Sequence, residues 1–133
     1  MRNILAVILT GSMLPLCAIE IPNFGVQCAG VLHTKHIRNR YRSEIQVGAH
    51  AHWYFDHGHG LLTEFNITQN APLLCGYYTH HFEGKPIGLC NMIGITTRGA
   101  GFGIGYDYNQ HFGVQAKFTT SHNTVHLGAR YTF

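Results

Sequence analysis

The chain has 133 residues, enough for one domain, and only 11% of them are charged, against roughly 25% in an ordinary soluble domain. Hydrophobic residues make up 45% and the mean hydropathy is only -0.02, so the low charge does not come from long apolar runs. A formal net charge of +3 is too small to indicate a nucleic-acid-binding protein. The composition is typical of a sheet that alternates apolar and polar residues in a membrane.

Residues 1–18 are typical of a signal peptide for export. Arg2 makes a short basic start, an apolar core follows, and Ala18 ends a cleavable sequence. The segment is too short and too interrupted for a spanning helix. Cys17 raises the alternative of a lipid-anchored protein, but the residues before it lack the small side chain that lipid attachment needs. We therefore expect cleavage after Ala18 and a mature barrel of residues 19–133.

Eight segments of the remaining chain alternate between apolar and polar residues, as strands do when one face is apolar. No helix is needed anywhere. One polar residue, Asn91, interrupts an apolar face. The predicted strands comprise residues 24–34, 44–55, 61–68, 73–78, 87–96, 101–108, 114–119 and 124–133.

Every second predicted strand ends in aromatic residues on its apolar face. An even number of strands brings these ends to the same edge of an antiparallel meander, where both chain termini also lie. Amphipathic rings prefer the headgroup level of a membrane, so the pattern predicts an interfacial girdle. Its predicted members are Trp53, Phe55, Tyr78, Tyr106, Tyr108, Tyr131 and Phe133.

The opposite face of the strands gathers carboxylates, fixed cations, histidines and amides. An eight-stranded barrel has an interior just wide enough for side chains to fill, and buried charges must be paired. We expect a plugged, hydrogen-bonded lumen, with a narrow proton or ion path as the alternative. The predicted lumenal residues are Glu44, Gln46, His50, His52, Glu64, Asn66, Asp107, Gln115, Lys117, His126 and Arg130.

Three motifs carry a family resemblance: Lys85-Pro86-Ile87, Gly99-Ala100-Gly101-Phe102 and the closing segment Leu127 to Phe133. The chain resembles the small eight-stranded outer-membrane barrels, namely the OmpA membrane domain and the OmpX/Ail group. The resemblance implies an all-β, eight-stranded antiparallel up-and-down transmembrane β-barrel in a Gram-negative outer membrane, encoded by a bacterium or by a phage that it carries. It also implies a monomer without cofactors that contacts membrane lipid, with a final strand ending at Phe133 that the barrel assembly machinery reads.

The same resemblance implies a structural or surface-interaction role and no porin activity. Most outer loops of this chain are shorter than those of OmpX/Ail adhesins, which speaks against adhesion. The basic segment from Lys35 to Arg42 is predicted to be the longest outer loop. We expect it to lie beside lipopolysaccharide phosphates, with simple solubility of the loop as the alternative. The predicted contact residues are Lys35, Arg38, Arg40, Arg42 and Arg98.

An alternative function is lipid A 3-O-deacylation, because Ala71-Pro72 and Lys85-Pro86 also resemble the PagL-type deacylases. That family carries a His-x-Ser-Asn motif on its seventh strand, whereas the matching segment here ends Thr119-Thr120-Ser121 without a histidine. Adjacent residues of a strand point to opposite faces, so Ser121 and His122 would pair only in a distorted turn. The catalytic candidates under this alternative are Ser121, His122 and His126.

The 11 histidines are spread over the lumen and the rim, and we predict no metal site from them. Cys75 and Cys90 flank the Glu83-Gly84 turn and are predicted cross-strand neighbours, either as a disulfide or as two packed thiols. Cys28 would then be free. A third class of function is a soluble periplasmic barrel that binds a small apolar ligand.

Overall fold

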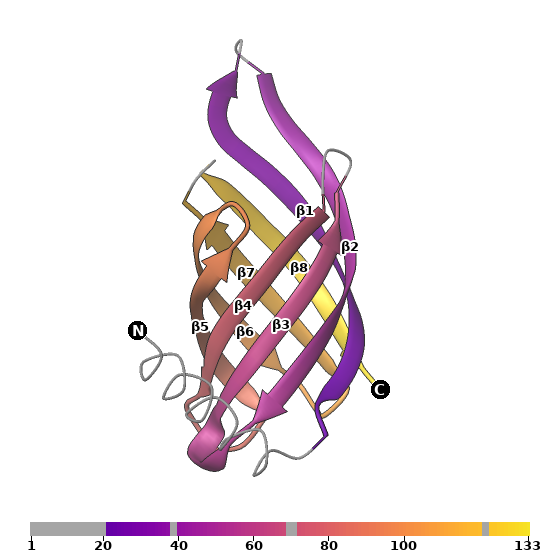
Figure 1. Cartoon of the computed structure of the whole chain (residues 1–133), viewed down its shortest axis with the longest axis vertical. Helices are drawn as coiled ribbons and strands as arrows, with labels where there is room; N and C mark the ends of the chain where they lie inside the picture. Colours follow the sequence, from indigo (N-terminus) through magenta and orange to yellow (C-terminus); the bar gives the residue numbers. More distant parts are fainter. Residues whose placement is uncertain (1–20, 38–39, 69–71, 121–122) are drawn as a thin grey trace, which may run out of the picture.

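The computed structural model describes residues 21–37, 40–68, 72–120 and 123–133, and within them leaves aside the side chains of residues 34–37, 40–42 and 56. Neighbouring strands pair antiparallel in sequence order, and the first also pairs with the last, so the sheet closes into a barrel (Figure 1). This confirms the predicted eight-stranded up-and-down fold. The strands are β1 (Asn23–Ile37), β2 (Arg40–Tyr54), β3 (His59–Ile67), β4 (Pro72–His81), β5 (Gly88–Thr96), β6 (Gly99–Asp107), β7 (Phe112–Thr119) and β8 (Thr124–Thr132).

A single 3-10 turn, η1 (Asp56–Gly58), joins β2 to β3. The chain reverses there because His57 and Gly58 both take positive φ angles, of 62° and 79°. A side chain at position 58 would meet the carbonyl oxygen of His81, so glycine also lets the turn pack against the end of β4. Among the described residues, no helix is long and apolar enough to cross a membrane.

Side chains alternate between the inside and the outside of the barrel, as the pleat requires. Along β4 the alternation is unbroken from Pro72 to His81. All eleven side chains predicted to line the lumen lie inside, and each of these residues is at most 8% exposed. The polar interior is therefore confirmed.

The basic segment differs from the predicted loop. β1 continues to Ile37 and β2 begins at Arg40, so Lys35, Arg40 and Arg42 belong to strands, while Arg38 lies outside the described residues. The pairing of β1 with β2 shifts register between His33 and Ile37, and the hairpin extends past the rest of the barrel (Figure 1). Strand pairing needs only backbone groups, so a hairpin beyond the core can form without apolar alternation.

The predicted pairing of Cys75 with Cys90 is wrong. Cys90 on β5 lies opposite His81 on β4, whereas Cys75 lies opposite Thr96. Cys75 and His81 are six residues apart on β4. Six residues of a strand span about 20 Å, far beyond the roughly 7 Å that a disulfide bridges between Cα atoms. Both are therefore free, buried thiols, and Cys28 is a free thiol on the outside. The error came from assuming a tight turn at Glu83-Gly84, whereas the connection runs from residue 82 to residue 87.

Candidate functional site

The outer wall of the barrel is apolar all the way round. Each strand carries at least one large hydrophobic side chain that is more than a third exposed, such as Ile45 at 71% and Leu127 at 54%. Soluble monomers rarely expose continuous apolar patches larger than a few hundred Å². The wall is therefore suited to an apolar surrounding. One member from each strand is Val26, Ile45, Phe65, Leu74, Ile93, Ile104, Phe118 and Leu127.

Exposed aromatic side chains form a belt at the end of the barrel where the C-terminus lies. Neighbouring rings touch along the belt: the Tyr106 and Tyr108 centroids are 4.9 Å apart, and those of Tyr131 and Phe133 are 6.0 Å apart. Of the predicted girdle residues, only Trp53 is half-buried. The exposed members of the belt are Phe55, Tyr78, Phe82, Tyr106, Tyr108, Phe112, Tyr131 and Phe133.

Polar exceptions on the outer wall gather at the level of this belt. His59 pairs with His80 across β3 and β4, and His80 pairs with Asn91 across β4 and β5. The two imidazole rings stack with centroids 4.6 Å apart, and the Tyr78 hydroxyl is hydrogen-bonded to Nδ1 of His59. Asn91, the residue that interrupts the apolar alternation, therefore lies beside other polar groups near the rim.

The interior near the belt is organised around Asp107 at the end of β6. Nη2 of Arg130 donates to both carboxylate oxygens, at 2.8 and 2.7 Å, and Nε donates to Oδ1 at 3.2 Å. Nε2 of His81 lies 2.6 Å from Oδ2 of the same carboxylate. Charge-assisted, multidentate contacts of this kind hold a planar guanidinium and a carboxylate in one orientation.

A second ion pair lies deeper in the barrel. Lys117 Nζ contacts Oε1 of Glu64, and both side chains are at most 5% exposed. Asn66 Nδ2 donates to the other carboxylate oxygen at 3.2 Å, and Gln27 Nε2 donates to Asn66 Oδ1 at 2.6 Å. The ammonium also lies 4.9 Å from the centre of the Tyr77 ring. The pair is thus surrounded by hydrogen-bond donors and an aromatic face, as buried charges require.

The interior also holds an apolar cluster from β3, β4 and β5. The cavity beside the Lys117 and Glu64 pair has a free volume of about 10 Å³, room for about one water molecule. Among the described side chains, the interior at this level is therefore closely packed, which stiffens the barrel. The cluster comprises Leu62, Leu73, Cys75, Tyr77, Cys90 and Met92.

We expect the purified protein to give no channel steps above background in planar lipid bilayers, because its lumen is filled by side chains. The measurement is single-channel current at moderate voltage and salt, with a general porin as the positive control. Stable conductance steps that track protein concentration would contradict a plugged lumen.

The predicted hydrolase and lipopolysaccharide residues are only partly placed. His126 lies inside the barrel, where its Nδ1 is 2.8 Å from Gln46 Oε1 and its Nε2 is 3.3 Å from Thr119 Oγ1. It is therefore not on the outer wall, whereas Ser121 and His122 lie outside the described residues. Arg98 is half-buried in the turn between β5 and β6, at the same end as the basic hairpin.

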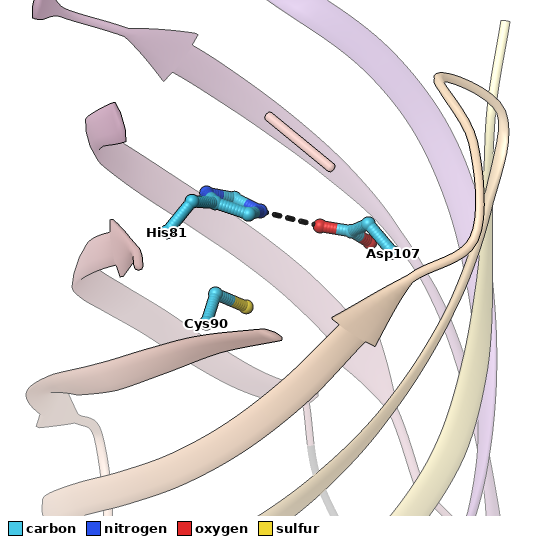
Figure 2. A group of neighbouring side chains, drawn as sticks. All are labelled: His81, Cys90 and Asp107. Atoms are coloured by element: carbon cyan, nitrogen blue, oxygen red, sulfur yellow. Dashed lines mark hydrogen bonds and ion pairs between the residues drawn. The ribbon is translucent and has the colours of Figure 1, made fainter. Parts of the chain in front are cut away.

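One cluster was missed by sequence reasoning. His81, Cys90 and Asp107 point toward one another from β4, β5 and β6, with one potential ligand atom of each within 4.8 Å of the others (Figure 2). The alternation predicts that Asp107 faces inward, but the predicted fourth strand ends at residue 78, before His81. Extending the strand alternation four residues beyond Tyr77 would have placed His81 inside as well.

Two lumenal histidines of the described part of the chain, His50 and His52, have separate hydrogen-bond partners. His50 Nε2 lies 3.2 Å from Thr132 Oγ1, and His52 Nε2 lies 2.8 Å from Thr79 Oγ1. Each imidazole therefore has its own hydroxyl partner in the interior.

Comparisons of the chain with protein-family models, with curated proteins and with solved structures find no match.

Proposed function

We propose that the protein is a small, non-porin β-barrel of a Gram-negative outer membrane with a structural or surface-interaction role. The observation that carries this proposal is the inverted distribution of side chains: charged groups such as Arg130 and Glu64 are 3% exposed, while Ile45 and Ile95 are more than 70% exposed. In water this arrangement would be unfavourable, because it buries charged side chains that water solvates and exposes apolar side chains that water does not solvate. In a bilayer, lipid covers the apolar wall and the charges pair with one another.

The dimensions of the strands support the same proposal. β3 to β8 have eight to ten residues each, close to the roughly 9 to 11 residues that a tilted strand needs to cross the hydrocarbon core. The aromatic belt would lie at one headgroup level. In the orientation usual for such barrels, the belt and the C-terminus face the periplasm.

The opposite rim would then face the cell exterior, where the outer leaflet carries lipopolysaccharide. Arg98 and the hairpin with Lys35, Arg40 and Arg42 lie at that rim and would meet lipid phosphates, which arginine binds in a bidentate manner. At the other end, the final strand with Phe133 would be read by the barrel assembly machinery. Both partners follow from the proposed location, and we expect a monomer.

We expect the protein to remain with the membrane fraction after alkaline carbonate extraction. The folded form should also migrate differently from the boiled form on a gel, because a closed barrel resists detergent unfolding. A periplasmic soluble protein processed in parallel serves as the control and should be released by carbonate. A monodisperse protein that is stable in water without detergent would overturn the proposal and favour the soluble, ligand-binding barrel.

Lipid A 3-O-deacylation stays a prediction from the sequence. Its candidates Ser121 and His122 lie outside the described residues, and His126 is hydrogen-bonded inside the barrel. A hydrolase that acts on a lipid ester needs its nucleophile and base together on the lipid-facing wall. Of the three candidates, the structure describes only His126, and that imidazole lies away from the outer wall.

A further inference from the structure

His81, Cys90 and Asp107 form a compact group of three different donor atoms inside the barrel. His81 and Cys90 are direct partners across β4 and β5, and Asp107 pairs with Gly88, two residues from Cys90 on β5. The residues are 0%, 0% and 5% exposed. Three neighbouring strands thus bring an imidazole, a thiol and a carboxylate to one level near the belt end (Figure 2).

The chemistry of these donors selects a class of metal ion. Zinc is bound in proteins by thiolate, imidazole and carboxylate in combination, usually in tetrahedral geometry. Magnesium and calcium prefer oxygen ligands alone, so a thiol among the donors disfavours them. We propose that His81, Cys90 and Asp107 bind a zinc-like divalent transition-metal ion, with water at the fourth position.

The neighbours of the group hold its side chains in place. Arg130 donates to both oxygens of the Asp107 carboxylate, including Oδ2, which also contacts His81, and outer-shell partners of this kind orient a ligand. Nδ1 of His81 is buried and has no hydrogen-bond partner among the described residues, so it can carry the imidazole proton when Nε2 binds a metal ion.

Two glycines give the donor atoms room. A Cβ atom at Gly105 would lie 3.1 Å from Sγ of Cys90, and a Cβ at Gly113 would collide with Oδ1 of Asp107. A larger residue at position 113 would displace the carboxylate, and one at position 105 would require the thiol to shift by a few tenths of an ångström.

Binding would replace the hydrogen bond between His81 Nε2 and Asp107 by coordination, leave the neutral imidazole with its proton on Nδ1, and release the Cys90 thiol proton to solvent. The alternative is a metal-free network in which Arg130 and His81 neutralise Asp107 while Cys90 fills space. The metal site and the metal-free network differ in one observable, a bond between the Cys90 sulfur and the metal.

Cobalt(II) is a suitable probe because a thiolate ligand gives it a charge-transfer absorption that imidazole and carboxylate ligands do not give. Surface histidines such as His57 and His111 can bind cobalt, but not with this signature.

The experiment is a cobalt titration of the folded, chelator-treated protein in detergent. The natural chain should show the thiolate charge-transfer band, and zinc should abolish it by displacement. C90S should lose the band and weaken cobalt binding by at least about tenfold, the lower range seen for loss of mere outer-shell partners. C75S is the matched control, because Cys75 is also a buried lumenal thiol but lies six residues from His81 along β4. This variant should keep the band.

Absence of the band in the folded natural chain would overturn the proposal without any variant. A band that survives in C90S would also overturn it. Should C90S fail to fold, the triple variant C17S/C28S/C75S leaves Cys90 as the sole cysteine of the four and must keep the band. The metal site requires only the folded barrel and not a membrane. Release of the protein by carbonate would therefore contradict the proposed location without affecting the metal site, and absence of the cobalt band would contradict the metal site without affecting the location.

Discussion

Replacing Glu64 with glutamine should lower the free energy of unfolding by about 3–5 kcal/mol, the usual cost of removing one partner from a buried ion pair. The variant keeps the size of the side chain and an oxygen for Asn66. It removes the negative charge that neutralises the Lys117 ammonium, which is only 5% exposed. The penalty is thus the desolvation of an uncompensated charge and not the loss of a hydrogen bond.

The double variant E64Q/K117M should be close to the natural chain in stability, because it removes both charges together. Stability can be measured by urea titration of the refolded barrel in micelles, with the unheated gel shift as the readout of folding. E83Q is the matched control, since Glu83 is exposed in the turn between β4 and β5, and it should change stability by less than about 0.5 kcal/mol. A double variant as unstable as E64Q would show that the interior does not depend on this charge balance.

Replacing Ile104 with arginine should destabilise the barrel in lipid vesicles by about 2–4 kcal/mol, the cost of a charged side chain facing lipid near the bilayer midplane. Ile104 lies in the middle of β6 and is 51% exposed on the outer wall. Tyr108, just beyond the same strand, is 59% exposed in the aromatic belt. Y108R should therefore cost only about 0–1 kcal/mol, because its charge would reach the interface.

This pair of variants separates a lipid-facing wall from a water-facing wall. Both positions are about equally exposed, so in a soluble barrel each substitution should change stability by no more than about 0.5 kcal/mol. The measurement is again urea unfolding, in vesicles and without lipid. Equal, small effects of I104R and Y108R would mean that depth in a bilayer plays no part, and the proposed location would fail.

Much of the fold could be predicted because the side-chain period of a strand is a local property. In β6, Phe102 and Ile104 point outward while Asp107 points inward, and each neighbour in sequence takes the other face. The same reasoning correctly sorted the lumenal charges and most of the aromatic belt.

Strand register could not be predicted, because it depends on the length and shape of each connection. A shift of six residues in the β4 to β5 pairing separated Cys75 from Cys90 and brought His81 beside Cys90 instead. The proposed metal-binding group exists only in that register. The basic hairpin was misjudged for a related reason: beyond the core, pairing is held by backbone groups, and alternation no longer marks a strand.

β1 and β8 pair from Gly25 opposite Thr132 to His33 opposite Thr124, and this seam joins residues about a hundred positions apart in the chain. Until β1 and β8 pair, each is an edge strand with unpaired backbone amide and carbonyl groups, to which another polypeptide can hydrogen-bond. The aggregation-prone species is therefore the open barrel, in which β1 and β8 are not yet paired. The rate at which these two strands pair would decide how much of the newly synthesised protein aggregates.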